Sequence, residues 1–183
     1  MKILITGGSG FIGTHLIDKI LKEKYDILNF DKKESSIFPE KTIIGDIRDF
    51  NILKKVTKDI DLIIHLAAEH KDNIHPQSLY YDVNVKGTQN IIDACEIHNI
   101  NRIIFTSTVS IYGINPTDTS EDSTPNPFND YGKSKLQAEQ LLINWWKKKN
   151  GRSLSIIRPT VVFGERNRGN VYNLMEQVAN NKF

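Results

Sequence analysis

A cluster of glycines at positions 7, 8, 10 and 13 directly follows the first apolar run of the chain, KILIT at 2–6. The residues after the cluster have the apolar spacing of a helix, to about position 23. In a loop that holds a pyrophosphate, Gly7 permits the tight turn, Gly10 lets the backbone approach the phosphates, and Gly13 allows close helix packing. The helix N-terminus adds free N–H groups that attract the same anion. The segment therefore predicts a dinucleotide-binding loop.

Short apolar runs alternate with helical patterns along the rest of the chain. We expect strands at 2–6, 25–30, 41–44, 61–66, 101–107 and 154–159, and helices at 11–23, 49–57, 78–98, 130–149 and 170–181. The strand candidates are nearly continuous in apolar residues, as in parallel strands that are buried on both faces. Regular alternation joins such strands by right-handed crossovers. The pattern predicts an α/β doubly wound parallel sheet, the Rossmann fold, with helices on both faces.

Composition narrows the possible partners. A formal net charge of +2 over 183 residues is too small to indicate a nucleic-acid partner, and the apolar runs are too short to indicate a membrane span. The only cysteine, Cys95, excludes an internal disulfide, and the opening MKILITGG lacks the layout of a signal peptide. We therefore expect a cytoplasmic protein. No metal site is expected, because the histidines at 65, 70 and 75, together with Glu69, have no standard ligand spacing.

An acidic residue ends the second predicted strand. Asp31 comes about 18 residues after the last glycine of the loop, near the position from which a carboxylate binds the adenosine ribose. A carboxylate there repels a 2′-phosphate and favours NAD over NADP, although Lys32 or Lys33 could pair with such a phosphate. NAD is the predicted cofactor. After the third strand, Asp46 and Ile47 could flank the adenine, or Asp46 could cap the next helix.

Tyr131 and Lys135 lie four residues apart, and therefore one above the other on a helix. The pair alone is a weak motif, but it follows both the predicted loop and a strand that ends in the hydroxyl residues TST at 106–108. A phenol with a pKa of about 10 is a poor base at neutral pH. An ammonium group one turn away, with a nicotinamide cation nearby, would lower that pKa, and Thr108 could hydrogen-bond the same substrate hydroxyl.

The chain resembles a known family in several segments. TGGSGFIG, DLIIHLAA, NVKGT, TSTVSIYG, YGKSK and IIRPTVVFG occur in the order seen in extended short-chain dehydrogenases/reductases, and the resemblance is closest to nucleotide-sugar epimerases and dehydratases. It runs from residue 3 to about residue 170, and it implies an NAD-dependent enzyme with a nucleotide-sugar substrate. It also implies a homodimer formed through the helices at 78–98 and 130–149. Because such enzymes continue into a smaller substrate domain, we expect residues 1–183 to be an NAD-binding domain from which that part is largely absent.

The resemblance also assigns roles to individual residues. Thr108, Tyr131 and Lys135 match the catalytic Ser/Thr, Tyr and Lys of the family, and Tyr131 and Lys135 are expected to contact the cofactor as well. The other residues implied at the cofactor are Gly7, Gly10, Phe11, Ile12, Gly13, Asp31, Lys32, Asp46, Ile47, Leu66, Ala67, Ala68, Asn84 and Ser107.

Two positions after Thr108 distinguish the reactions of the family. In the related 4,6-dehydratases the threonine precedes Asp-Glu, which eliminate water, whereas Val109 and Ser110 stand here. The resemblance therefore favours epimerisation, expected at C4 of a UDP-sugar through a transient 4-keto sugar. The alternatives are a nucleotide-sugar dehydratase or reductase, or a truncated non-catalytic dinucleotide-binding module. Arg166 and Arg168 could bind the diphosphate or lie in a solvated loop.

Overall fold

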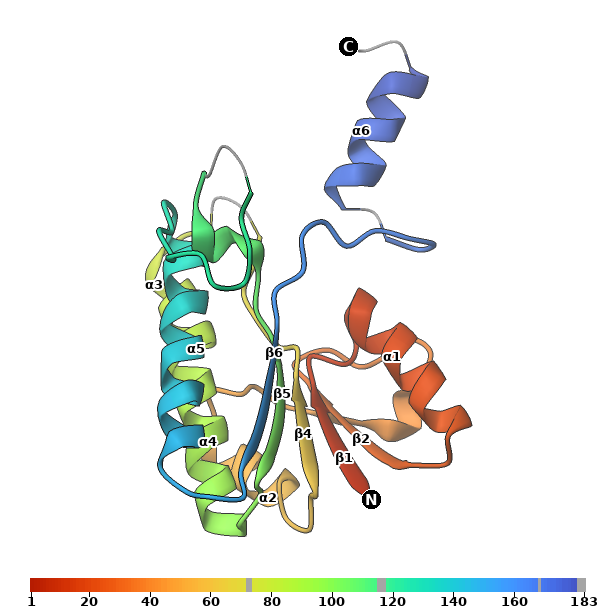
Figure 1. The fold of residues 1–183 in the computed structure, drawn as a ribbon. Coiled ribbons are helices and arrows are strands. Elements are labelled where there is room, and N and C mark those ends of the chain that lie inside the picture. Colours follow the sequence, from red (N-terminus) through yellow and green to blue (C-terminus); the bar gives the residue numbers. More distant parts are fainter. Residues whose placement is uncertain (72–73, 115–117, 168, 181–183) are drawn as a thin grey trace.

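A six-stranded parallel sheet forms the middle of the molecule, with the strands in the order β3-β2-β1-β4-β5-β6 (Figure 1). The computed structural model describes residues 1–71, 74–114, 118–167 and 169–180. This strand order is that of a dinucleotide-binding Rossmann sheet, whose direction of winding reverses between β1 and β4. The predicted fold class is confirmed. The strands are β1 (Lys2–Thr6), β2 (Asp26–Asp31), β3 (Thr42–Ile44), β4 (Leu62–His65), β5 (Arg102–Thr106) and β6 (Ser153–Ile157).

Helices cover both faces of the sheet. In Figure 1, α1 (Phe11–Lys22) lies on one face, while α2 (Phe50–Val56), α4 (Gly87–His98) and α5 (Asp130–Lys147) lie on the other. The helix predicted at 78–98 consists of α3 (Ser78–Tyr81), a π-helical turn η2 (Asp82–Lys86) and α4 in succession. Two short 3₁₀ turns, η1 (Pro39–Lys41) and η3 (Val109–Tyr112), were not predicted. The last helix, α6 (Asn170–Ala179), lies beyond the carboxyl ends of the strands.

Successive side chains of the central strands enter opposite cores. Ile3 and Ile5 of β1 pack with α1, whereas Leu4 packs in the larger core beneath α2, α4 and α5. Side chains that alternate between two buried faces explain why the strand candidates are continuously apolar. Cys95 is buried in the larger core, and its burial raises the pKa of the thiol to about 12. Among the described residues, no helix is long and apolar enough to cross a membrane.

The N-terminus of α2 is capped by Asp49 and not by Asp46, which was one of the two alternatives for Asp46. The side chain of Asp49 accepts hydrogen bonds from the backbone N–H groups of Asn51 and Ile52 and thereby caps α2. Asp46 instead binds the guanidinium of Arg48, with 2.6 Å between Oδ2 and Nη2. The alternative in which Asp46 caps the helix is therefore wrong, because Asp49 stands directly before the first helical residue.

Candidate active site

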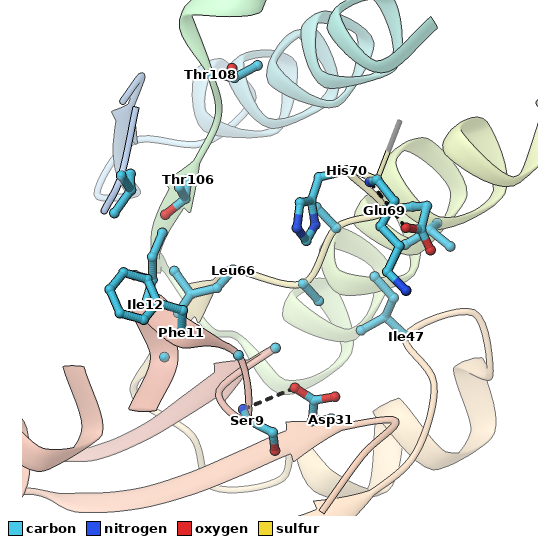
Figure 2. A pocket seen from close by; sticks show the side chains of 18 of the residues that line it. Ser9, Phe11, Ile12, Asp31, Ile47, Leu66, Glu69, His70, Thr106 and Thr108 are labelled. Carbon is cyan, nitrogen blue, oxygen red and sulfur yellow. Dashed lines mark hydrogen bonds between the residues drawn. The ribbon is translucent and has the colours of Figure 1, made fainter. Parts of the chain in front are cut away.

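A cavity of about 840 Å³ opens at the carboxyl ends of the strands. It is lined by the glycine loop after β1 and by the segments that follow β2, β3, β4, β5 and β6. In Figure 2, Asp31 and Ser9 lie at one end of this cavity and Thr108 at the other. A cavity of this size at the reversal point of a doubly wound sheet is where such folds bind an extended ligand.

The glycine loop has no room for side chains at Gly7 and at Gly13, where a Cβ would meet backbone atoms. Gly7 has a φ of +76°, and a Cβ added there would lie 2.6 Å from the backbone nitrogen of Ala67. A Cβ on Gly13 would lie 2.4 Å from Cα of Gly8, so Gly13 allows α1 to pack against the loop itself. No side chain caps α1 at its N-cap residue, Gly10. The amide groups of its first turn are therefore available to an anion in the cavity.

Asp31 is held firmly at the end of β2. Its Oδ2 accepts from the backbone N–H of Ser9 at 3.0 Å, and its Oδ1 accepts from that of Lys33 at 3.0 Å (Figure 2). The hydroxyl of Ser9 in turn donates to the carbonyl of Lys33 at 2.7 Å and accepts from Nδ2 of the buried Asn29 at 3.0 Å. The glycine loop and the second strand are thus joined around the carboxylate. Sequence reasoning missed Ser9 and Asn29, although a polar residue inside the apolar run YDILNF was a usable signal.

A second carboxylate, that of Glu69, also lines the cavity. Its Oε2 lies 3.7 Å from Nζ of Lys32. Its backbone is fixed by the side chain of Asn84, which accepts from the Glu69 N–H at 2.8 Å and donates to the Glu69 carbonyl at 3.0 Å. Asn84 also donates to the hydroxyl of Ser134 on α5 at 2.9 Å. Asn84 is therefore a support behind the cavity, and among the residues that the resemblance implies at the cofactor it alone does not line the cavity.

The three predicted catalytic residues meet at the far end of the cavity. Lys135 is buried, and its Nζ lies 4.1 Å from the centroid of the Phe105 ring. Burial lowers the pKa of Lys135 to about 7, against a smaller raising effect of Glu139. Burial raises the pKa of Tyr131, while a hydrogen bond with the Thr108 side chain lowers it. The residues of the chain therefore raise the pKa of Tyr131, whereas the sequence predicts a lowered pKa when the cofactor is bound.

Ser107 has an unpaired polar atom beside the cavity. Its backbone N–H donates to the carbonyl of Ile157 at 2.7 Å, which joins β5 to β6. Its buried hydroxyl has no hydrogen-bond partner among the described residues, although Ser107 lines the cavity. A buried hydroxyl without a partner indicates a ligand group. With the uncapped α1, the close approach at Gly7 and the fixed carboxylate of Asp31, this fits a dinucleotide.

Most of the predicted site residues line the cavity. Those that line the cavity are Gly7, Gly10, Phe11, Ile12, Gly13, Asp31, Lys32, Asp46, Ile47, Leu66, Ala67, Ala68, Ser107, Thr108, Tyr131 and Lys135. Nε of Arg166 lies 3.8 Å from a carboxylate oxygen of Glu165, and Arg168 lies outside the described residues. Both ring nitrogens of the buried His65 are engaged by hydroxyls, those of Thr6 at 2.7 Å and Thr88 at 3.1 Å.

Comparison with known proteins finds one family over nearly the whole chain. Residues 3–182 match the model described as the NAD dependent epimerase/dehydratase family. The N-acetyl-alpha-D-glucosaminyl-diphospho-ditrans,octacis-undecaprenol 4-epimerase of Escherichia coli O157:H7 is 50% identical over 99% of this chain and 55% of its own length. A UDP-glucose 4-epimerase of Lactobacillus helveticus is 32% identical over 93% of this chain and 54% of its own length. The chain thus spans about half the length of the curated relatives it matches.

Solved structures share the same architecture. The UDP-glucuronic acid 4-epimerase from Bacillus cereus in complex with NAD superposes with a TM-score of 0.85 at 30% identity, over 98% of this chain and 64% of that one. The UDP-Glc/GlcNAc 4-epimerase of Campylobacter jejuni superposes with a TM-score of 0.84 at 28% identity, over 100% of this chain and 63% of that one.

Proposed function

The chain belongs to the NAD-dependent epimerase/dehydratase family, and on that premise we propose that it is the NAD-binding and catalytic part of a 4-epimerase that acts on a diphosphate-linked sugar. The observation that carries this proposal is the meeting of Thr108, Tyr131 and Lys135 in one cavity with the glycine loop. A base and a hydroxyl donor beside a dinucleotide site are the groups that oxidation of a sugar hydroxyl requires.

NAD is the cofactor we propose, and solved relatives such as the Bacillus cereus epimerase bind it. When bound, NAD would accept and return a hydride. Its pyrophosphate would bind at the N-terminus of α1, and its adenosine ribose at Asp31. A carboxylate at the adenosine ribose would repel the 2′-phosphate of NADP, so charge repulsion at Asp31 would favour NAD. The salt bridge between Lys32 and Glu69 supports this preference, because it engages one of the two lysines that could pair with a 2′-phosphate.

In the proposed reaction, the chain's own residues transfer a proton to and from the substrate. Tyr131 takes the proton of the sugar hydroxyl at C4 as a hydride leaves that carbon, and gives the proton back when the hydride returns to the other face. Thr108 orients the hydroxyl, and the ammonium group of Lys135 stabilises the phenolate of Tyr131. The next residues supply no acid–base pair for elimination, because the side chain of Val109 is apolar and that of Ser110 is a neutral hydroxyl. This favours an epimerase over a dehydratase.

The carrier of the sugar separates two candidate substrates. The sequence predicts a UDP-sugar, and several relatives are named UDP-glucose 4-epimerases. The relative at 50% identity is named for N-acetylglucosamine linked through a diphosphate to undecaprenol. That higher identity favours the polyprenyl-linked N-acetylhexosamine as the substrate. Three further points stay predictions: a C-terminal substrate-binding part that completes residues 1–183, a cytoplasmic location, and a homodimer through the helices at 78–98 and 130–149.

The test uses the chain together with the substrate-binding part that is predicted to complete it. We expect it to interconvert the C4 epimers of polyprenyl-diphospho-N-acetylhexosamine with bound NAD⁺ and without net change in NADH absorbance. The Tyr131→Phe variant should lose nearly all turnover and keep NAD⁺ binding. Conversion of UDP-sugars alone would assign the second substrate class, and steady NADH consumption would assign a reductase. If neither substrate is converted while NAD⁺ binds, the epimerase proposal is wrong and a non-catalytic module remains.

A further inference from the structure

A buried ion pair lies one helical turn from Lys135. Glu139 on α5 is 1% exposed, and both of its carboxylate oxygens accept from Arg158, at 3.0 Å from Nε and 2.7 Å from Nη2. This two-point geometry is the strong form of the arginine–carboxylate pair. The mechanism proposed above uses neither residue, yet a buried pair of this kind is costly unless its partners are fully bonded.

Arg158 is bonded on its remaining side as well. Its Nη1 donates to the carbonyl of Glu121 at 2.9 Å and to the hydroxyl of Tyr112, and the guanidinium lies 5.3 Å from the Tyr112 ring centroid. The Tyr112 hydroxyl also donates to the Glu121 carbonyl, at 3.1 Å. These contacts join α5, η3, the segment before α5 and the residue after β6. The carboxylate of Glu139 is therefore held in one place.

Tyr131, Lys135 and Glu139 follow one another at intervals of four residues, so they form one stripe along α5. Among the described residues, the Phe105 ring and the Thr106 carbonyl contact the amine of Lys135, and the imidazole of His65 is near enough to be affected by its charge. His65 is neutral near pH 7 because burial lowers its pKa to about 3. Glu139 is thus the anionic group on this stripe, and it opposes the effect of burial on the pKa of Lys135.

We propose that Glu139, fixed by Arg158, is a positioning residue whose buried negative charge increases the fraction of Lys135 that is in the ammonium form near pH 7. The importance of that form for catalysis rests on the proposed function, because only an ammonium group stabilises the phenolate of Tyr131. The charge relation itself is a property of the folded chain. It can therefore be tested without cofactor or substrate.

The experiment is an NMR titration of the 183-residue chain labelled with ¹³C in its lysine side chains. The Lys135 signal, identified by its loss in K135R, should titrate near pH 7. In E139Q we expect its midpoint to fall by about one pH unit, a roughly tenfold loss of proton affinity. E139D should keep the midpoint close to that of the parent chain. The matched control is E96Q, which breaks the ion pair between the buried side chain of Arg152 and the exposed Glu96 and should leave Lys135 unchanged.

E139Q could fail to fold, because it leaves Arg158 with an incomplete partner. The double variant E139Q/R158Q replaces the ion pair with a neutral pair and should also lower the Lys135 midpoint. An unchanged or raised midpoint in whichever of these variants folds would overturn the proposal, whatever the activity of the enzyme. In the full-length enzyme, E139Q should move the basic limb of the kcat profile to lower pH with little change in KM. A profile displaced in KM alone would count against the proposal.

Discussion

Nζ of Lys135 donates a 2.7 Å hydrogen bond to the carbonyl oxygen of Thr106, the last residue of β5. This bond joins the middle of α5 to the carboxyl end of a central strand. It places the amine beneath the cavity, where burial rather than a neighbouring charge dominates its protonation. Several measurable properties of the chain depend on this relationship and on similar contacts between distant segments.

Lys135 should give the chain a distinct dependence of stability on pH. Its pKa is lowered from 10.5 to about 7 in the folded state, so between these values the unfolded chain binds a proton that the folded chain does not. Stability from this group is therefore full above pH 10.5 and is lost as the pH falls to 7. Relative to K135M, the free energy of unfolding should rise by about 1 kcal/mol per pH unit from about pH 7 to 9. Urea unfolding at several pH values measures this slope, and K133M, at an exposed site on the same helix, is the control. Parallel profiles for the parent chain and K135M would contradict it.

His65 should make the stability of the chain depend on pH in the acidic range. Burial, and to a lesser extent the charge of Lys135, lowers the pKa of His65 from 6.5 to about 3. The stability it contributes is present above pH 6.5 and is lost as the pH falls toward 3. His65→Gln keeps polar groups near Thr6 and Thr88 but cannot titrate, so its acid unfolding should be shallower by about 1 kcal/mol per pH unit. Circular dichroism during acid titration measures the difference, with the exposed His15→Gln as control. Equal slopes in H65Q and the parent chain would show that His65 is not the group responsible.

Gly7 should be necessary for cofactor binding because of space and not only because of its backbone angle. Gly7 and Gly151 both have a positive φ, +76° and +86°, but only Gly7 is crowded, whereas a Cβ on Gly151 meets nothing within 4 Å. Each alanine variant should lose about 1 kcal/mol of stability from its backbone conformation. We expect G7A to weaken NAD⁺ binding by at least about tenfold, equivalent to about 1.4 kcal/mol, and G151A to leave it unchanged. Isothermal titration calorimetry decides, and equal affinities in the two variants would exclude the steric explanation.

The bond between Asn29 and Ser9 should support NAD⁺ binding from beneath the loop. Asn29→Val suits a buried strand but removes the amide that donates to the Ser9 hydroxyl at 3.0 Å. We expect N29V and S9A each to weaken NAD⁺ binding by about fivefold, which corresponds to one hydrogen bond of about 1 kcal/mol. Because the two residues share that bond, the double variant should lose less than the sum. Strictly additive losses in this double-mutant cycle would show that the bond does not act on the cofactor site.

Sequence patterns predicted the features that depend on residues close together in the chain. Strand positions followed from apolar continuity, and most helices from their periodicity. The glycine loop followed from its spacing between a strand and a helix. The predictions erred where one sequence pattern is compatible with two local structures. The helical pattern at 78–98 contains the π-helical turn η2, and Asp49 rather than Asp46 caps α2. Periodicity does not report a one-residue change in helix winding, and only the chain path decides which of two nearby carboxylates meets the free amides.

The sequence by itself therefore determined the parallel sheet, the glycine loop and the placement of Tyr131 and Lys135 on one helix face. Each of these features depends on residues close together in the chain. Only the tertiary structure decided that Asn29 supports Ser9, that Asn84 holds Glu69, and that Arg158 fixes Glu139. These partners lie on different elements, and the strand order brings them together. Burial, which lowers the pKa of Lys135 and raises that of Tyr131, likewise exists only once the sheet and its helices have packed.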